Sequence, residues 1–312
     1  MAAVDRNNPK RAASSESRMS LMEFMREFPD DAACLEHLWR VRYSPDGEHA
    51  HCPKCDTERV FKKYAIANRR SSWTCTGCGH HMHPLAGTIF HKSPTSLHLW
   101  FYAMYLMGST RCGISAKQLE RELGVTYKCA WRMANQIRTH LMTQDDTEPL
   151  EGDVETDETF IGGKPRANSK LTASEHRDRK KIVWGAVERK GKVRAEVVPF
   201  SGAGDLRPRV LDNVKAGSNL HSDGWHVYKT LADVYTHQWV DHGAGVYVSG
   251  DVHTQTIEGF WSLMKRGIGG VYHNVSAQWL QTYVDEYCFH YNTRQGMDLF
   301  RVLLARAALP TT

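Results

Sequence analysis

Three acidic residues lie close together in residues 154–164, which read VETDETFIGGK. Thr, Val, Phe and Ile favour a β-strand, and the two glycines end it. A buried strand rarely carries acids, because an isolated buried charge is unfavourable unless it is paired or bound to a metal ion. Alternation along the strand sends Glu155 and Asp157 to one face and Glu158 to the other. We therefore expect Asp157 to bind a divalent metal ion, with the other two in supporting or solvated positions. An ordinary edge strand is the alternative.

A fourth carboxylate follows a second predicted strand. Residues 219–224 read NLHSDG and place Asp223 at the carboxyl end of that strand. Open α/β sheets collect their binding and catalytic groups at this edge. Asp223 is therefore expected to lie near Asp157.

A fifth carboxylate, Glu258, belongs to a predicted helix over residues 253–267. Ile257, Trp261 and Met264 form one stripe of that helix, and Glu258, Ser262 and Lys265 form a neighbouring stripe. With Trp261 on the core side, Glu258 faces the sheet, and Lys265 is placed to hold a phosphate beside the metal site. The alternative is a solvated face of an amphipathic helix. Among the histidines, His253 is the one expected nearest to this site.

Four cysteines form the strongest single motif. They occur as two Cys-x-x-Cys pairs, Cys52 with Cys55 and Cys75 with Cys78. Thiolates on two such knuckles converge on one tetrahedral Zn²⁺ ion, which predicts a zinc ribbon. Its function is either a structural clip or recognition of a DNA end.

Two predicted helices flank Gly124, over residues 115–123 and 126–138. Helix, short glycine turn and helix is the helix-turn-helix pattern, whose second helix enters the major groove of DNA. We expect this helix to expose Lys128, Arg132 and Arg138 to DNA. A generic pair of packed helices is the alternative.

Basic residues also follow the acidic strand, over residues 164–181, which include Lys180 and Lys181. Such a run is usually a solvated loop, but beside a phosphodiester site it would contact the DNA backbone. The net charge of +5, from 40 basic and 35 acidic residues, is compatible with a nucleic-acid partner without requiring one. The longest apolar run, residues 97–107, is too short to span a bilayer. Eight cysteines, four of them in paired motifs, favour a reducing compartment, so we expect a soluble intracellular protein.

The order and spacing of Asp157, Asp223 and Glu258 resemble those of the DDE transposases of insertion sequences. The segments TDETFIGGK, HSDGW and TIEGFWSLMKRG are similar to the branch that carries an N-terminal zinc ribbon and is related to Merlin elements. The resemblance runs from about Phe24 to Leu303 and includes CPKC, CTGC, LAGTIFHKSP and the helix pair.

This resemblance implies an α/β fold, with an RNase H-like mixed-sheet catalytic domain preceded by a zinc ribbon and a helix-turn-helix region. Asp157, Asp223 and Glu258 would form a triad that binds Mg²⁺ or Mn²⁺, and Lys265 with its neighbour Arg266 would contact the transposon end. The implied protein binds the terminal inverted repeats of its element, cleaves double-stranded DNA there and joins the ends to target DNA. It would act in the bacterial cytoplasm, at the nucleoid, as a homodimer or larger assembly on DNA and with no membrane partner.

Composition and motif positions predict the following domain order. A disordered tail (1–18) precedes N-terminal helices and the zinc ribbon (19–95), a helix-turn-helix region (96–143), an acidic linker (144–153) and the catalytic domain with its C-terminal helices (154–312).

Two other functions remain open. One is a sequence-specific DNA-binding regulator or a domesticated transposase without strand transfer, although a pure regulator has no reason to keep the acidic triad. The other is an RNase H-like nuclease that acts on RNA–DNA hybrids. The two candidate DNA-reading modules favour sequence-specific DNA over that substrate.

Overall fold

The computed structural model describes residues 19–65, 70–144, 147–162, 180–245, 248–295 and 298–311. The chain divides into two compact units. The first comprises Met1–Arg111, Ala116–Leu141 and Arg294–Thr312, and the second comprises Cys112–Ser115 and Met142–Thr293. The predicted tail and most of the basic run after residue 163 lie outside the described residues. In the parts of the chain just given, no helix combines the length and the apolar character needed to cross a membrane.

A four-stranded antiparallel sheet in the first unit carries the cysteine pairs. Its strands pair in chain order: β1 (His49–Cys52), β2 (Thr57–Tyr64), β3 (Ser72–Cys75) and β4 (His81–Met82). Cys52 ends β1 and Cys75 ends β3, so each Cys-x-x-Cys knuckle begins where a strand stops. The sheet is anchored by Trp73 of β3, which stacks on Trp39 at a centroid distance of 4.8 Å.

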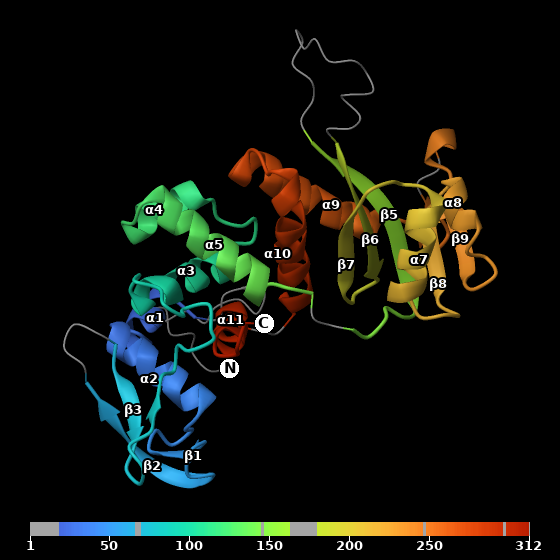
Figure 1. Ribbon diagram of the computed structural model, residues 1–312. Helices are drawn as coiled ribbons and strands as arrows, with labels where there is room; N and C mark the ends of the chain where they lie inside the picture. Colours follow the sequence, from blue (N-terminus) through green and yellow to red (C-terminus); the bar gives the residue numbers. More distant parts are fainter. Residues whose placement is uncertain are drawn as a thin grey trace, which may run out of the picture. The chain divides into compact units, whose positions relative to one another are not determined.

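Helices complete the first unit (Figure 1): α1 (Leu21–Glu27), α2 (Asp31–Arg42), α3 (Leu97–Ser109), α4 (Ala116–Leu123), α5 (Tyr127–Leu141) and α11 (Leu299–Ala307). Pro29 separates α1 from α2, and Asp30 caps the start of α2 by accepting a hydrogen bond from the backbone N–H of Ala33. The predicted pair of helices around Gly124 is also present, and Gly124 takes a φ of +63°, which favours glycine.

The last helix packs in the first unit, whereas we expected residues 294–312 to belong with the catalytic part of the chain. Phe300 of α11 meets Phe24 and Phe28 edge-on, at centroid distances of 5.5 Å and 5.9 Å. Gly108 of α3 permits this approach, since a Cβ there would lie 3.3 Å from the backbone nitrogen of Phe300. An apolar helix face can pack on any matching core, so its sequence does not reveal which core it joins.

A five-stranded mixed sheet forms the second unit. Its strand order is β7-β6-β5-β8-β9. The members are β5 (Asp153–Ile161), β6 (Lys181–Glu188), β7 (Val193–Val198), β8 (Asn219–Asp223) and β9 (Thr236–Val240). β5, β6 and β7 are antiparallel, and β8 and β9 run parallel to β5. A separate small hairpin pairs β10 (Val248–Ser249) with β11 (Val252–His253). The predicted α/β class is confirmed.

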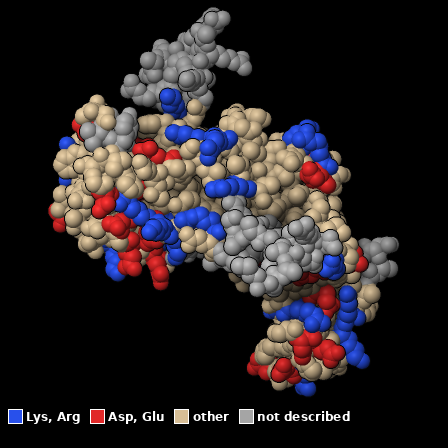
Figure 2. All heavy atoms as spheres, turned by 180° about the vertical axis from the view of Figure 1, so that it is seen from behind, with Lys and Arg blue, Asp and Glu red and all other residues tan. Residues whose placement is uncertain are grey.

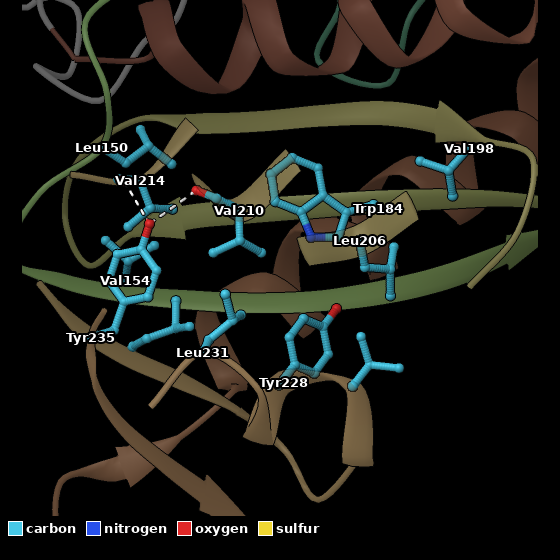
Figure 3. Packing of buried hydrophobic residues seen from close by; sticks show 13 residues of the cluster. Leu150, Val154, Trp184, Val198, Leu206, Val210, Val214, Tyr228, Leu231 and Tyr235 are labelled. Carbon is cyan, nitrogen blue, oxygen red and sulfur yellow. Dashed lines mark hydrogen bonds between the residues drawn. The ribbon is translucent and has the colours of Figure 1, made fainter. Parts of the chain in front are cut away.

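Helices cover both faces of this sheet: α7 (Ala203–Asn213) and α8 (His226–Lys229) on one, α9 (Gln255–Gly267) and α10 (Leu280–Thr293) on the other. The core under α7 and α8 includes Trp184 and Leu220 from the sheet (Figure 3). At the edge of this core, the hydroxyl of Tyr235 lies within hydrogen-bonding distance of the carbonyl oxygens of Val210 and Val214, at 3.3 Å and 2.8 Å, and donates to them. The core under α9 and α10 includes Val183 and Trp261.

The stretch predicted as a linker joins this core. Leu150 is 1% exposed, forms a parallel bridge with Val214, and accepts and donates backbone hydrogen bonds there. Its side chain belongs to the cluster under α7 and α8. An acidic composition does not exclude a buried side chain, and Leu150 attaches this stretch to the second unit.

Candidate active site

The central strand β5 carries four acids, and three of them, Glu155, Asp157 and Glu158, have different surroundings. Glu155 and Asp157 hydrogen-bond to α9, and Glu158 hydrogen-bonds to Tyr228 of α8 on the other face. β8 pairs with β5 only as far as Glu155 opposite His221. Asp223, two residues beyond His221, therefore ends its strand at the level of Asp157.

Asp157 is the most perturbed carboxyl group of this region. Burial, together with the negative charges of Glu158 and Asp223, raises the pKa of Asp157 to about 7. The indole Nε1–H of Trp261 donates to Asp157 Oδ2 at 3.0 Å and opposes that shift. The sequence places Trp261 on the core side of its helix, and the structure agrees, since only 4% of it is exposed.

The indole of Trp261 reaches Asp157 because the opposite residue on β6 is a glycine. Gly185 pairs with Asp157, and a Cβ on Gly185 would lie 2.6 Å from the Trp261 ring. Any larger residue would displace the Trp261 ring, so the glycine at position 185 is required for the ring to approach the backbone of β6 closely.

Glu158 lies on the α8 face and is also protected from water. The Tyr228 hydroxyl donates to Glu158 Oε2 at 2.7 Å. Burial raises the pKa of Glu158, the Tyr228 hydrogen bond opposes the shift, and the charge of Asp223 adds to it. Asp223 thus acts electrostatically on two acids of β5.

Glu258 faces the same pocket as Asp157. Its Oε1 accepts a hydrogen bond of 2.8 Å from the hydroxyl of Thr254. The pocket is lined by Asp157, Glu158, Thr159, Phe160, Glu258, Trp261, Ser262, Lys265 and Arg266. Lys265 and Arg266 are both exposed, so two cationic side chains border a pocket whose floor is acidic.

The three acids of the expected triad approach one another without converging fully. Asp157 shares a pocket with Glu258 and an electrostatic interaction with Asp223. Within the described ranges, the four cysteines are the one group of potential metal ligands whose ligand atoms all lie within 4.8 Å of one another. Oxygen-rich carboxylate sets suit Mg²⁺ and Mn²⁺. Burial and the charges of Glu158 and Asp223 raise the pKa of Asp157, and a divalent cation would offset both effects.

Glu155 is fully buried, in contrast to a solvated position. Five groups surround its carboxylate: the backbone N–H groups of Thr256 and Ile257, the Thr256 hydroxyl, Arg189 and His253. His253, the histidine expected nearest to the site, ends β11 two residues before α9 and contacts Glu155; it does not line the pocket.

The four cysteine sulfurs have the spacing of a zinc site. Cys52 Sγ lies 3.6 Å from Cys78 Sγ, and Cys55 Sγ lies 3.9 Å from Cys75 Sγ. Sulfurs placed about 2.3 Å from a zinc ion at tetrahedral corners are separated by about 3.8 Å. The cluster is therefore consistent with the predicted zinc ribbon, and these four thiols are the residues that would hold the ion.

The basic residues expected to contact DNA differ in exposure. Lys128 and Lys180 are exposed. Arg138 is only 2% exposed, so its expected position on the surface of α5 is wrong. Arg132 is half-buried: it lies over the Trp100 ring at 5.4 Å and donates to the Thr95 hydroxyl at 3.1 Å. More of the surface of α5 is buried than its apolar residues predict, because an arginine can bury its aliphatic stem while its guanidinium forms hydrogen bonds inside the protein.

Two contacts of the site escaped the sequence analysis. Arg189 lies in a basic turn that reads as solvated, yet its guanidinium reaches Glu155. Tyr228 lies in a helix of four residues and caps Glu158. Both depend on contacts between segments far apart in the sequence, and the available signal was only the improbable placement of several acids in one central strand.

Comparison with known proteins agrees with this arrangement. Residues 149–292 match the model of the ISXO2-like transposase domain. A protein of Halobacterium salinarum, described as an uncharacterized protein in transposable element ISH50, is 31% identical over 234 residues, which are 69% of this chain and 76% of the relative. The matched domain spans the mixed sheet together with α9 and most of α10. The chain therefore belongs to the ISXO2-like family of insertion-sequence transposases.

Proposed function

We propose that this transposase cuts and joins DNA with Asp157, Asp223 and Glu258 as its metal-binding triad. The observation that carries the proposal is the placement of the acids: Asp157 and Glu258 line one pocket, and Asp223 ends the strand next to β5. The pKa of Asp157, raised by burial and by the neighbouring acids Glu158 and Asp223, supports it. Acids held together against their repulsion are typical of functional sites. The family membership supports the same conclusion.

The acidic and the basic residues have separate roles in this proposal. When bound, divalent cations would activate a water or 3′-hydroxyl and neutralise the charge that develops on the phosphate. Asp157, Asp223 and Glu258 would hold them, and the basic residues of the pocket would orient the DNA. Lys265 and Arg266 bind phosphates flanking the scissile one, and Ser262 lies beside them on α9.

We also propose that the second unit is RNase H-like. The antiparallel strands β7-β6-β5 extended by parallel β8 and β9 support this assignment. The zinc ribbon and the α4–α5 pair, proposed as a helix-turn-helix, would read the terminal inverted repeats. Lys128 on α5 is exposed and remains a proposed DNA contact, as do Lys180 and Lys181. A homodimer on two ends would bring both cleavage sites together.

Substitution of the triad tests the chemistry. Asp157→Asn, Asp223→Asn and Glu258→Gln keep side-chain size and remove one charge each. We expect each variant to bind double-stranded end DNA as the wild type does, and to lose cleavage by at least about 100-fold, because a metal ligand has been removed. Labelled end DNA incubated with Mg²⁺ measures cleavage, and a gel shift of the same DNA measures binding.

An acid of the same unit that does not line the pocket provides the control. Glu196→Gln removes a charge that pairs with Arg209 at 3.3 Å, away from the pocket, and should cleave normally. Wild-type cleavage by any of the three triad variants would refute the assignment of that residue. A wild-type protein that shifts end DNA and never nicks it would favour the DNA-binding regulator.

A further inference from the structure

The helix that carries Glu258 begins without a cap from its own side chains. Thr254 holds the N-cap position of α9 but makes no side-chain capping bond, and its hydroxyl donates to Glu258 Oε1 instead. The first N–H groups of a helix have no partner within the helix and need one elsewhere. In α9 that partner comes from the sheet.

Glu155 supplies the missing cap from β5. Its Oε2 accepts from the backbone N–H groups of Thr256 and Ile257, at 2.7 Å and 3.0 Å. Its Oε1 accepts from the Thr256 hydroxyl at 2.9 Å. A carboxylate at this end also interacts favourably with the helix dipole. No part of the Glu155 side chain is exposed, so these interactions are not weakened by water.

Arg189 compensates the buried charge and extends the contact. Its Nε donates to Glu155 Oε1 at 2.8 Å. Its two terminal nitrogens donate to the carbonyl oxygens of Asp251 and His253, at 2.7 Å and 3.0 Å. The segment that leads into α9 is therefore attached to the same carboxylate as the helix itself.

We propose that Glu155 is a positioning residue for catalysis, acting with Arg189 to set the distance between Glu258 and Asp157. Two acids of β5 contact α9 on either side of Glu258: Glu155 at Thr256 and Ile257, and Asp157 at Trp261. The start of α9 then has no freedom to slide along β5. This inference rests on the proposed function of Asp157 and Glu258.

Glu155→Gln tests the proposal in the full-length protein. The backbone N–H groups of Thr256 and Ile257 and the Arg189 guanidinium all donate hydrogen bonds to the Glu155 carboxylate. In Glu155→Gln a side-chain N–H₂ group replaces one of the two accepting oxygens, so a donor then faces donors. We expect end-DNA binding to be unchanged, the single-turnover cleavage rate to fall roughly 10–100-fold, and the Mn²⁺ concentration for half-maximal cleavage to rise by a similar factor. Electron paramagnetic resonance of free Mn²⁺ should report weakened binding directly. Hydrogen exchange at the Thr256 and Ile257 amides should accelerate.

Two further variants keep the result interpretable. Arg189→Gln leaves the cap in place and removes its charge partner, so it should show a smaller change in the same direction, and it replaces Glu155→Gln if that variant fails to fold. Glu151→Gln is the matched control, because Glu151 pairs with Lys215 at 2.6 Å on the exposed surface of the same unit. It should leave cleavage, Mn²⁺ affinity and exchange unchanged.

The outcomes separate this inference from the proposed function. The positioning role would be overturned if Glu155→Gln and Arg189→Gln lowered thermal stability but kept the Mn²⁺ affinity and cleavage rate of the wild type. A wild-type protein that neither cleaves end DNA nor binds Mn²⁺ would overturn the proposed function instead, and exchange at Thr256 and Ile257 would then show whether Glu155 caps the helix.

Discussion

At the scale of single residues, the central feature is one strand in which Glu155, Asp157 and Glu158 have three different environments. Glu155 is fully buried and surrounded by donors, Asp157 is half-buried beside other acids, and Glu158 accepts a hydrogen bond from Tyr228. Glu155 and Asp157 share a face, so alternation alone cannot separate their roles. The separation comes from α9, which offers backbone donors at one position and an indole N–H two residues along the strand.

The raised pKa of Asp157 predicts a stability that depends on pH. Its folded-state pKa of about 7 lies above the ordinary value of 3.8, so folding favours the protonated carboxyl. This contribution is complete below about pH 4 and is lost as the pH rises through about 7, by about 4 kcal/mol at most. Asp157→Asn stays neutral. Its free energy of unfolding, relative to wild type, should therefore rise between pH 5.5 and pH 8.

Urea unfolding without added Mg²⁺, in buffers that keep zinc bound, measures that difference. Asp223→Asn serves as a comparison, because removing its charge should lower the pKa of Asp157 and reduce the pH dependence in part. Parallel pH profiles for wild type and Asp157→Asn would show that Asp157 is already ionised at pH 5.5.

At the scale of elements, the stability of the four-stranded sheet β1–β4 depends more on its two Cys-x-x-Cys knuckles than on buried side chains of its own. β2 is mostly exposed, with Phe61 as its one buried residue. The remaining anchorage comes from Trp73 against Trp39 of α2. A four-stranded sheet with so few buried side chains needs an additional crosslink, which a closed zinc site supplies.

This predicts one zinc ion per chain and a local response to its removal. Cys75→Ser should lower the zinc content measured by mass spectrometry from one to near zero, and should change tryptophan fluorescence, because the stacked pair of Trp39 and Trp73 would separate. Cys288→Ser is the control, since Cys288 is buried in the second unit far from the cluster in sequence. Full zinc content in the Cys75 variant would argue against the four-thiol site.

At the scale of the whole molecule, the distribution of charge bears on how the protein would bind DNA. The face in Figure 2 shows Lys and Arg side chains interspersed with Asp and Glu. The net charge of +5 on 312 residues is modest. DNA affinity should therefore come from a limited number of phosphate contacts at defined places, not from one continuous basic surface.

Substitution of Lys128 tests whether α5, the second helix of the proposed helix-turn-helix, makes one of these phosphate contacts. Lys128→Ala should weaken end-DNA binding uniformly across sequences, and reduce the slope of log affinity against log salt concentration by about 1. Binding titrations at several salt concentrations measure that slope. Lys117→Ala on α4 is the control, because Lys117 is exposed but paired with Glu120 on its own helix. An unchanged slope for Lys128→Ala would remove α5 from the interface.

The amino-acid sequence alone determined the family, the α/β class and most of the helices and strands, because these depend on local periodicity, turn residues and short motifs. The four-cysteine cluster could be predicted for the same reason, because the spacing of the two ligands within each Cys-x-x-Cys knuckle is a local property of the sequence. Tertiary structure decided what Glu155, Arg189 and Tyr228 do, since each contacts a partner far away in the chain. It also buried Arg138 and brought α11 into the first unit. Burial and pairing depend on which surfaces meet, and no single segment carries that information.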